Sequence, residues 1–328
     1  MKGFDEKFSD FPDYIIGITR EIWEDRNIAT LHHYYSENIV VRSPAGITLG
    51  NAGVIAATMA TLAEFPDRTL LGEDVIWSGT PEEGMLSSHR IYSTATHAHS
   101  GVYGAATGKR LGYRIIADCH ARNNVIDDEW LIRDQGAIVR QLGVDPRDYA
   151  RQQIADEGGL LDAKHPFTSA VDQRGPYLGR GNDNPWGQQY SDILKRLMGA
   201  DFGAVESEYD RGCHLCYPGG VEGHSHGDVD QFWLGLRASF PSSTFRIEHC
   251  IGREDAHMPP RAAIRFSLEG KHDGWGSFGQ PSGADVYVMG AAHVEFGPRG
   301  IRREWVLFDE TAIWKQILLH TGQIGEGS

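Results

Sequence analysis

Hydrophobic residues recur at helical spacing near the start of the chain and at strand spacing further on. Ile15, Ile18 and Ile22 lie three or four residues apart, as on the buried face of an amphipathic helix, so helices are predicted within residues 11–35. Segments that alternate or are rich in β-branched residues predict strands. The remaining predictions for this half are helices at 51–62 and 135–142 and strands at 39–41, 70–77, 85–96, 109–121 and 125–134.

The second half of the chain repeats this succession of elements. Tyr35 matches Tyr209 at an offset of 174 residues, and Trp130 matches Trp305 at an offset of 175. Such matches run through both halves in register, which indicates a tandem duplication. In the second copy we predict helices at 190–197, 228–240 and 310–317, and strands at 213–217, 245–252, 261–269, 285–296 and 301–309.

In each copy the helices come first and three or four long antiparallel strands follow. This order is typical of an α+β fold in which helices cover one face of a curved sheet. We therefore predict two tandem cone-shaped α+β barrels, each with one open mouth. The expected domains are residues 1–144 and 186–328. Residues 145–185 are rich in glycine, proline and asparagine and are expected to form an irregular linker.

Composition narrows the range of partners. The 328 residues are 40% hydrophobic and 23% charged, with a net charge of −14, and they contain no cluster of Lys and Arg. This argues against nucleic acids and anionic membrane surfaces as partners. No apolar run is long enough to span a membrane, and the first residues lack the apolar stretch of a secretory signal. The expected location is the cytoplasm.

Two of the four cysteines, Cys213 and Cys216, have the C-x-x-C spacing of redox and zinc sites. A zinc site needs further ligands, and the nearest candidates are His224 and His226 in an expected loop. Cys213 and Cys216 fall on a predicted strand, where residues three apart point to opposite faces. No metal site is therefore expected.

Two motifs occur in both copies. A His-x-Gly leads into a glycine-rich segment, from His99 to Gly108 and from His272 to Gly283, and a Trp-x-x-x-Asp ends a later strand, at Asp134 and at Asp309. The second glycine-rich segment is interpreted as two residues longer, within Trp275-Gly276-Ser277, which predicts a different pocket mouth.

Together with the helix that follows each Asp, these motifs resemble the SnoaL-like polyketide cyclase family, which has the nuclear-transport-factor-2-like fold. The resemblance covers both copies and leaves the linker unexplained. Members of the family usually have one such module per chain, whereas this chain has two.

The resemblance implies cofactor-free ring closure by intramolecular aldol condensation. The catalytic Asp of the family falls on Asp309 and Asp134, and its pocket His on His272 and His99, with the second-copy pair as the leading candidates. Aromatic residues of the same motifs are expected to contact the substrate: Tyr103, Trp130, Trp275, Phe278 and Trp305.

The chemistry of these residues fits such a reaction. Burial in an apolar cone raises the pKa of a carboxyl towards neutrality, which suits a general base. A histidine can then donate to the oxygen on which charge develops. The alternative is structural, because each Asp precedes a helix that it can cap, and each His can bond to backbone at the lip of the barrel. His97 is the weaker candidate, because its counterpart is taken to be Gly270.

The leading hypothesis is an acid–base cyclase or isomerase that acts on an apolar, carbonyl-containing small molecule. The main alternative is a module of the same fold that binds such a ligand without chemistry. A third is that one copy has only a structural role. The two domains are expected to pair within the chain as a pseudo-dimer, which leaves room for homodimerisation.

Overall fold

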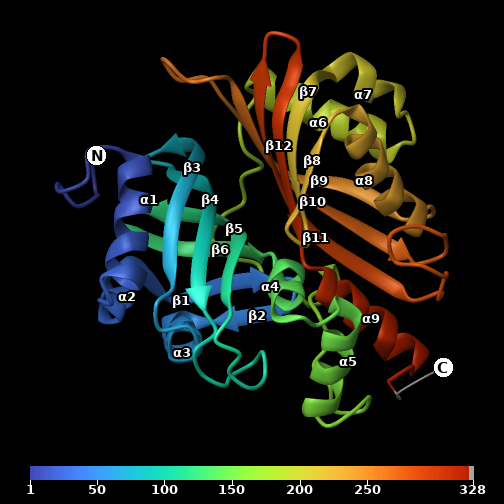
Figure 1. Cartoon of the computed structure of the whole chain (residues 1–328). Coiled ribbons are helices and arrows are strands. Elements are labelled where there is room, and N and C mark those ends of the chain that lie inside the picture. Colours follow the sequence, from blue (N-terminus) through green and yellow to red (C-terminus); the bar gives the residue numbers. More distant parts are fainter. Residues whose placement is uncertain (325–328) are drawn as a thin grey trace.

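The computed structural model describes residues 1–324 and contains two six-stranded sheets of identical topology (Figure 1). The strand order is β2-β1-β6-β5-β4-β3 in the first sheet and β8-β7-β12-β11-β10-β9 in the second. In each sheet one central pair is parallel, β1 with β6 and β7 with β12, and the other pairs are antiparallel. The α+β fold in two tandem copies is thus confirmed, but the sheets stay open at β2, β3, β8 and β9 and do not close into barrels.

The first domain follows the predicted order of elements, with two differences. The predicted N-terminal helical segment is divided, and its last residue, Tyr35, already belongs to a strand. A short strand, β2, was not predicted because four residues are too few to show a period. The elements are α1 (Phe11–Thr19), a π-helical turn (Arg20–Glu24), a 3-10 turn (Ile28–Thr30), α2 (Leu31–Tyr34), β1 (Tyr35–Ser43), β2 (Gly46–Leu49), α3 (Gly50–Glu64), β3 (Thr69–Thr80), β4 (Gly84–Thr96), β5 (Arg110–Arg122), β6 (Val125–Arg133) and α4 (Gln135–Leu142).

The second domain repeats this plan after a connection that carries one helix. That helix, α5 (Pro146–Asp156), packs beside the C-terminal α9 (Glu310–Thr321) (Figure 1). A 3-10 turn (Ser169–Val171) follows it. The other elements are α6 (Pro185–Met198), α7 (Gly203–Glu208), β7 (Tyr209–Tyr217), β8 (Val221–His224), α8 (His226–Ser239), β9 (Thr244–Arg253), β10 (Arg261–Lys271), β11 (Asp285–Gly297) and β12 (Gly300–Phe308).

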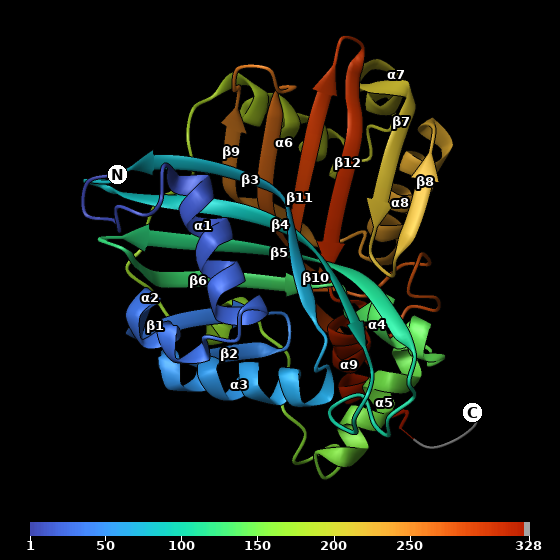
Figure 2. The same ribbon diagram turned by 60° about the vertical axis from the view of Figure 1, so that its left-hand side comes forward.

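The two sheets face each other and their strands cross steeply, while the helices cover the outer faces (Figure 2). Arg265 lies over the ring of Trp130 at 3.8 Å, and Arg90 lies over the ring of Trp305 at 3.6 Å. These residues occupy equivalent positions of the repeat, so the same contact is made twice. Arg265 also donates from Nε to the buried Asp118 at 3.1 Å. Within the described residues, no helix is both long and apolar enough to span a membrane.

The interiors of the two domains differ. The second is filled by a continuous core that includes Trp233, Phe266 and Phe308. The core of the first is split into separate clusters, one against α1 and one against α4. The space between sheet and helices in the first domain holds the cavity described next.

Candidate active site

A cavity of about 290 Å³ lies in the first domain, between its sheet and the helices α1 and α3. This is close to the lower end of the range for small-molecule sites, which are mostly apolar with a few polar groups. Most of the wall is apolar and comes from α1, β1 and β3 to β6: Ile15, Ile18, Val41, Leu70, Ile91, Ile115, Ala117, Ile126 and Leu131.

The cavity exists because the first domain has smaller side chains at positions that the second domain fills. At offsets of 174 or 175 residues, Thr58, Ile91 and Ser43 correspond to Trp233, Phe266 and Tyr217. All three of the smaller residues line the cavity, and the three larger ones are buried. Interiors are otherwise packed almost without voids, so the smaller side chains of the first copy leave a space at positions where the second copy has larger ones.

Glu129 on β6 supplies a carboxyl to the cavity, and sequence reasoning missed it. Its side chain is 5% exposed and lies opposite Cys119 of β5. Burial raises the pKa of Glu129 to about 7, although a hydrogen bond with Tyr35 offsets part of this effect. A carboxyl with this pKa exchanges a proton readily near neutral pH. A Glu-Trp pair stands in both copies, at 129 and 304, and this repeat was the available signal.

The counterpart of Glu129 in the second domain, Glu304, has a structural role. Its carboxylate accepts from three tyrosine hydroxyls, those of Tyr190 at 2.8 Å and of Tyr209 and Tyr217 at 2.7 Å. Glu304 is fully buried within the core. Equivalent carboxyls therefore have different surroundings in the two copies: Glu304 binds three tyrosines within a packed core, and Glu129 borders a cavity.

Two arginines, Arg68 and Arg133, line the cavity together with Gln135. Arg68 is 7% exposed, and burial lowers its pKa. Among residues 1–324, the Nε atoms of both arginines lack a hydrogen-bond partner. Buried charges are normally paired because desolvation is costly, so these guanidinium groups can receive an anionic or partly anionic oxygen.

The histidine of the cavity is His89 on β4, which was not predicted either. It is 2% exposed, and its Nε2 has no partner among the described residues. Burial, and then the neighbouring Arg90, lower the pKa of His89 to about 3. Its imidazole is neutral at physiological pH. The second-domain residues at the positions of Arg68, His89 and Arg133 are Ser243, Ile264 and Phe308.

Asp309, the leading catalytic candidate, belongs to the second domain but lines the cavity of the first. It caps α9: Oδ1 accepts from the backbone N–H of Thr311 at 2.8 Å and of Ala312 at 3.2 Å, and from the Thr311 hydroxyl at 2.7 Å. Burial raises the pKa of Asp309 to about 6. The carboxyl of Asp309 therefore caps a helix and also borders the cavity.

Asp134 caps α4 and does not border this cavity. Its carboxylate accepts from the backbone N–H of Ala137 at 2.9 Å and, in the β7–β8 turn of the second domain, of Gly219 at 2.8 Å and Gly220 at 3.1 Å. Burial raises the pKa of Asp134 to about 6. These bonds give it a structural role between the domains.

The histidine segments of the two copies align at an offset of 175 residues and not 173, so a different histidine of the first copy corresponds to His272. His97 and His272 make equivalent bonds: the backbone N–H of His97 donates to the carbonyl of Lys109 and that of His272 to the carbonyl of Ala284. Each Nδ1 also bonds to a hydroxyl, that of Thr107 or that of Ser282. His97, and not His99, is therefore the counterpart of His272. The expected two-residue extension of the second copy is wrong, because both segments have the same length.

None of these three histidines borders the cavity. His99 is exposed, and His97 is buried with its Nε2 3.1 Å from Glu64. Ser239 replaces Glu64 in the second copy, which leaves Nε2 of His272 without a partner among the described residues. Burial lowers the pKa of His272.

The aromatic residues expected to contact substrate are scattered. The Tyr103 hydroxyl donates to Gln135, which borders the cavity, and its ring stacks on Tyr149 of α5. Phe278 is buried in the core of the second domain, and Trp275 is 70% exposed. Trp130 and Trp305 lie between the sheets beneath arginines, because their side chains point to the face opposite to Glu129 and Glu304.

The sequence of the first domain matches a known family. Residues 14–142 match the model of the SnoaL-like polyketide cyclase family. No curated protein matches the chain.

Several solved structures are similar to one domain's length of this chain. IdmH from Streptomyces antibioticus is 23% identical over 40% of this chain and 98% of its own, with a TM-score of 0.36. A SnoaL-like polyketide cyclase from Agrobacterium tumefaciens is 20% identical over 41% and 98%, with a TM-score of 0.33. TsrD from Streptomyces laurentii is 16% identical over 40% and 93%, with a TM-score of 0.34. Residues 14–142 thus match the SnoaL-like polyketide cyclase family, and a second sheet of the same topology follows them in the chain.

Proposed function

We propose that the first domain is a cofactor-independent cyclase or isomerase that acts on a largely apolar small molecule with carbonyl groups. The observation that carries this proposal is the buried carboxyl of Glu129, with a pKa of about 7, on the wall of an apolar cavity. Asp309, with a pKa of about 6, borders the same space, as do two arginines whose Nε atoms have no hydrogen-bond partner among residues 1–324. Paired carboxyls in different environments are typical of acid–base catalysis.

In the proposed reaction Asp309 is the base, because its lower pKa leaves it the more ionised carboxyl at neutral pH. It removes a proton from the carbon next to a carbonyl, and the electron pair moves to the carbonyl oxygen. Arg68 and Arg133 stabilise the resulting enolate oxygen, as preorganised donors do in a largely apolar site.

The enolate carbon then attacks a second carbonyl carbon of the same molecule and closes the ring. Protonated Glu129 donates its proton to the new alkoxide, and solvent returns the proton from Asp309 to Glu129. The sequence consumes no oxidant or reductant. Each acid–base group of this kind contributes about 10²–10⁴-fold to the rate.

The comparison between the domains supports a role for these groups beyond folding. Arg68, His89 and Arg133 are replaced by Ser243, Ile264 and Phe308 in the second domain, which has the same topology. The fold therefore does not need a polar cavity. The second domain contributes Asp309 and otherwise has a packed interior.

The test follows α-proton exchange by proton NMR in deuterated buffer, with a panel of 1,3-dicarbonyl and β-keto ester compounds. We expect exchange faster than the uncatalysed rate with wild type, and a loss of about 100-fold or more in Asp309→Asn. Glu129→Gln should keep this exchange and lose ring closure, because Glu129 acts only after the enolate has formed. Asp134→Asn is the matched control, since it changes a capping carboxyl outside the cavity. Unchanged exchange in Asp309→Asn would refute the mechanism.

A binding module without chemistry is the second candidate, favoured by the two cavity arginines whose Nε atoms have no hydrogen-bond partner in the part of the chain that the structure describes. It predicts tight binding of an anionic, largely apolar compound without exchange. Binding by Asp309→Asn and Glu129→Gln would then equal that of wild type, whereas Arg68→Met would bind more weakly.

A further inference from the structure

The β7–β8 hairpin at the edge of the second sheet gathers four residues of metal-binding types on one face. His214 and Cys216 alternate along β7, and their partners across the hairpin are His224 and Glu222. Alternate residues of a strand share a face, and directly opposite residues are neighbours. Cys213 lies on the other face and is buried in the core, so the C-x-x-C pair diverges as expected.

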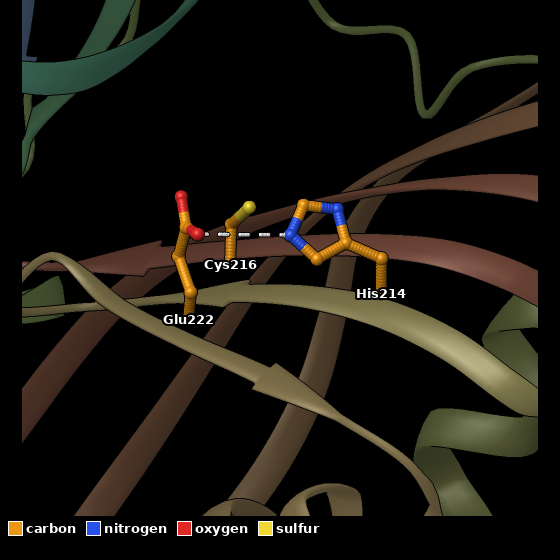
Figure 3. A group of neighbouring side chains, drawn as sticks. All are labelled: His214, Cys216 and Glu222. Carbon is orange, nitrogen blue, oxygen red and sulfur yellow. Dashed lines mark ion pairs between the residues drawn. The ribbon is translucent and has the colours of Figure 1, made fainter.

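Three of these side chains converge (Figure 3). One donor atom each from His214, Cys216 and Glu222 lies within 4.8 Å of the other two. Nε2 of His214 is 3.9 Å from Oε2 of Glu222, and the Cys216 sulfur lies between the imidazole and the carboxylate in this view. The ring of His224 stacks on that of His214, with centroids 4.9 Å apart, and supports its orientation.

These distances are close to those of an assembled site. Zinc–ligand lengths of about 2.0–2.3 Å place the donor atoms of a tetrahedral site roughly 3.3–3.8 Å apart. From the 4.8 Å limit the remaining contraction is at most about 1.5 Å. The side chain of Glu222 is 63% exposed and has room to move towards the other two ligands.

The fold itself does not require these residues. In the first copy the equivalent hairpin pairs Val40 with Leu49 and Arg42 with Ile47, so none of the four positions carries a histidine, cysteine or carboxylate. Of the two hairpins, that of the second copy carries this ligand set.

We propose that His214, Cys216 and Glu222 bind one Zn²⁺ ion, with water at the fourth position. Imidazole, thiolate and carboxylate together suit zinc, whereas magnesium and calcium prefer oxygen ligands alone. The ion ties the short edge strand β8 to β7. This site lies on the sheet hairpin, apart from the cavity of the first domain, and does not depend on the function proposed for that cavity.

The test uses the full chain after treatment with a chelator. Zinc is titrated in competition with a chromophoric chelator, and cobalt is titrated while its absorption is recorded. We expect one ion per chain and a sulfur-to-cobalt charge-transfer band that Cys216→Ser lacks. His214→Ala and Glu222→Gln should weaken zinc binding about 10–100-fold or more, since even outer partners of metal ligands are worth that much.

His165→Ala, which removes an exposed histidine of the connection between the domains, is the matched control and should bind as wild type does. His214→Ala and Glu222→Gln also cover the case in which Cys216→Ser, a change of a buried residue, fails to fold. Zinc should raise the melting temperature of wild type and of His165→Ala only. Failure to bind one equivalent at micromolar concentration, a cobalt complex without the sulfur band, or equal affinity in the ligand variants would overturn the proposal.

Discussion

The carboxyl of Glu129 should make the stability of the protein depend on pH in a way that one substitution removes. Its pKa rises from an ordinary value of 4.5 to about 7 in the folded state. The folded protein therefore holds this proton more tightly than the unfolded chain does. Stability is unaffected below about pH 4, falls as pH rises between the two pKa values, and carries the full penalty above about pH 7.

The magnitude follows from the same two values. A tenfold change in proton affinity corresponds to about 1.4 kcal/mol, so the penalty at pH 8 is about 3 kcal/mol. Glu129→Gln keeps the shape of the side chain and cannot ionise. We expect the variant to equal wild type at pH 4 and to exceed its free energy of unfolding by up to about 3 kcal/mol at pH 8.

The assay is urea denaturation of both proteins from pH 4 to pH 8.5. The difference between the two free energies of unfolding is the informative quantity, because it cancels every other titrating group. Glu37→Gln, a change on the exposed surface of the same domain, is the control and should show no such trend. A wild-type minus Glu129→Gln difference that is flat across this range would refute the assignment of a raised pKa.

Three further predictions concern buried polar groups. Arg68→Met removes a buried charge whose Nε has no partner among the described residues, so urea denaturation should show a gain of about 1 kcal/mol or more, while α-proton exchange falls about 100-fold or more. A loss of stability would contradict this. Arg265→Ala leaves the Asp118 carboxylate buried without its partner and should cost about 3–5 kcal/mol in thermal unfolding, and a loss under 1 kcal/mol would show that the contact between the sheets is weak. Glu64→Ala leaves two backbone N–H groups and the His97 ring without their hydrogen-bond acceptor, so it should lower the free energy of unfolding by about 3 kcal/mol. Glu64→Ser, which introduces the residue of the second copy, should lower it less.

Much of the fold could be predicted from the sequence, because its signals are local. Strand alternation located β3 to β6 and β9 to β12, and the repeat showed that the second half follows the first. The short strands β2 and β8 were missed because four residues do not establish a period. The wrong pairing of His99 with His272 came from matching a short His-x-Gly pattern, whereas backbone bonding to the neighbouring strand aligns His97.

The site was less predictable, because it depends on what the fold brings together. A cavity results from the volumes of Thr58, Ile91 and Ser43, which are far apart in the chain and unremarkable one by one. Asp309 was predicted as catalytic, but its place at the cavity of the other domain depends on how the two sheets pack. Glu129 carries no motif other than its neighbour Trp130, and its raised pKa follows from burial that only the fold provides.

The capping carboxyls have a consequence for how this protein can be divided. Asp134 bonds to the second domain, and Asp309 of the second domain borders the cavity of the first. A fragment of residues 1–144 would contain the cavity wall without Asp309, and the remaining fragment would contain Asp309 without the cavity. The two copies therefore act as one unit, because separating them would remove Asp309 from the cavity that it borders and Asp134 from the backbone N–H groups that it binds.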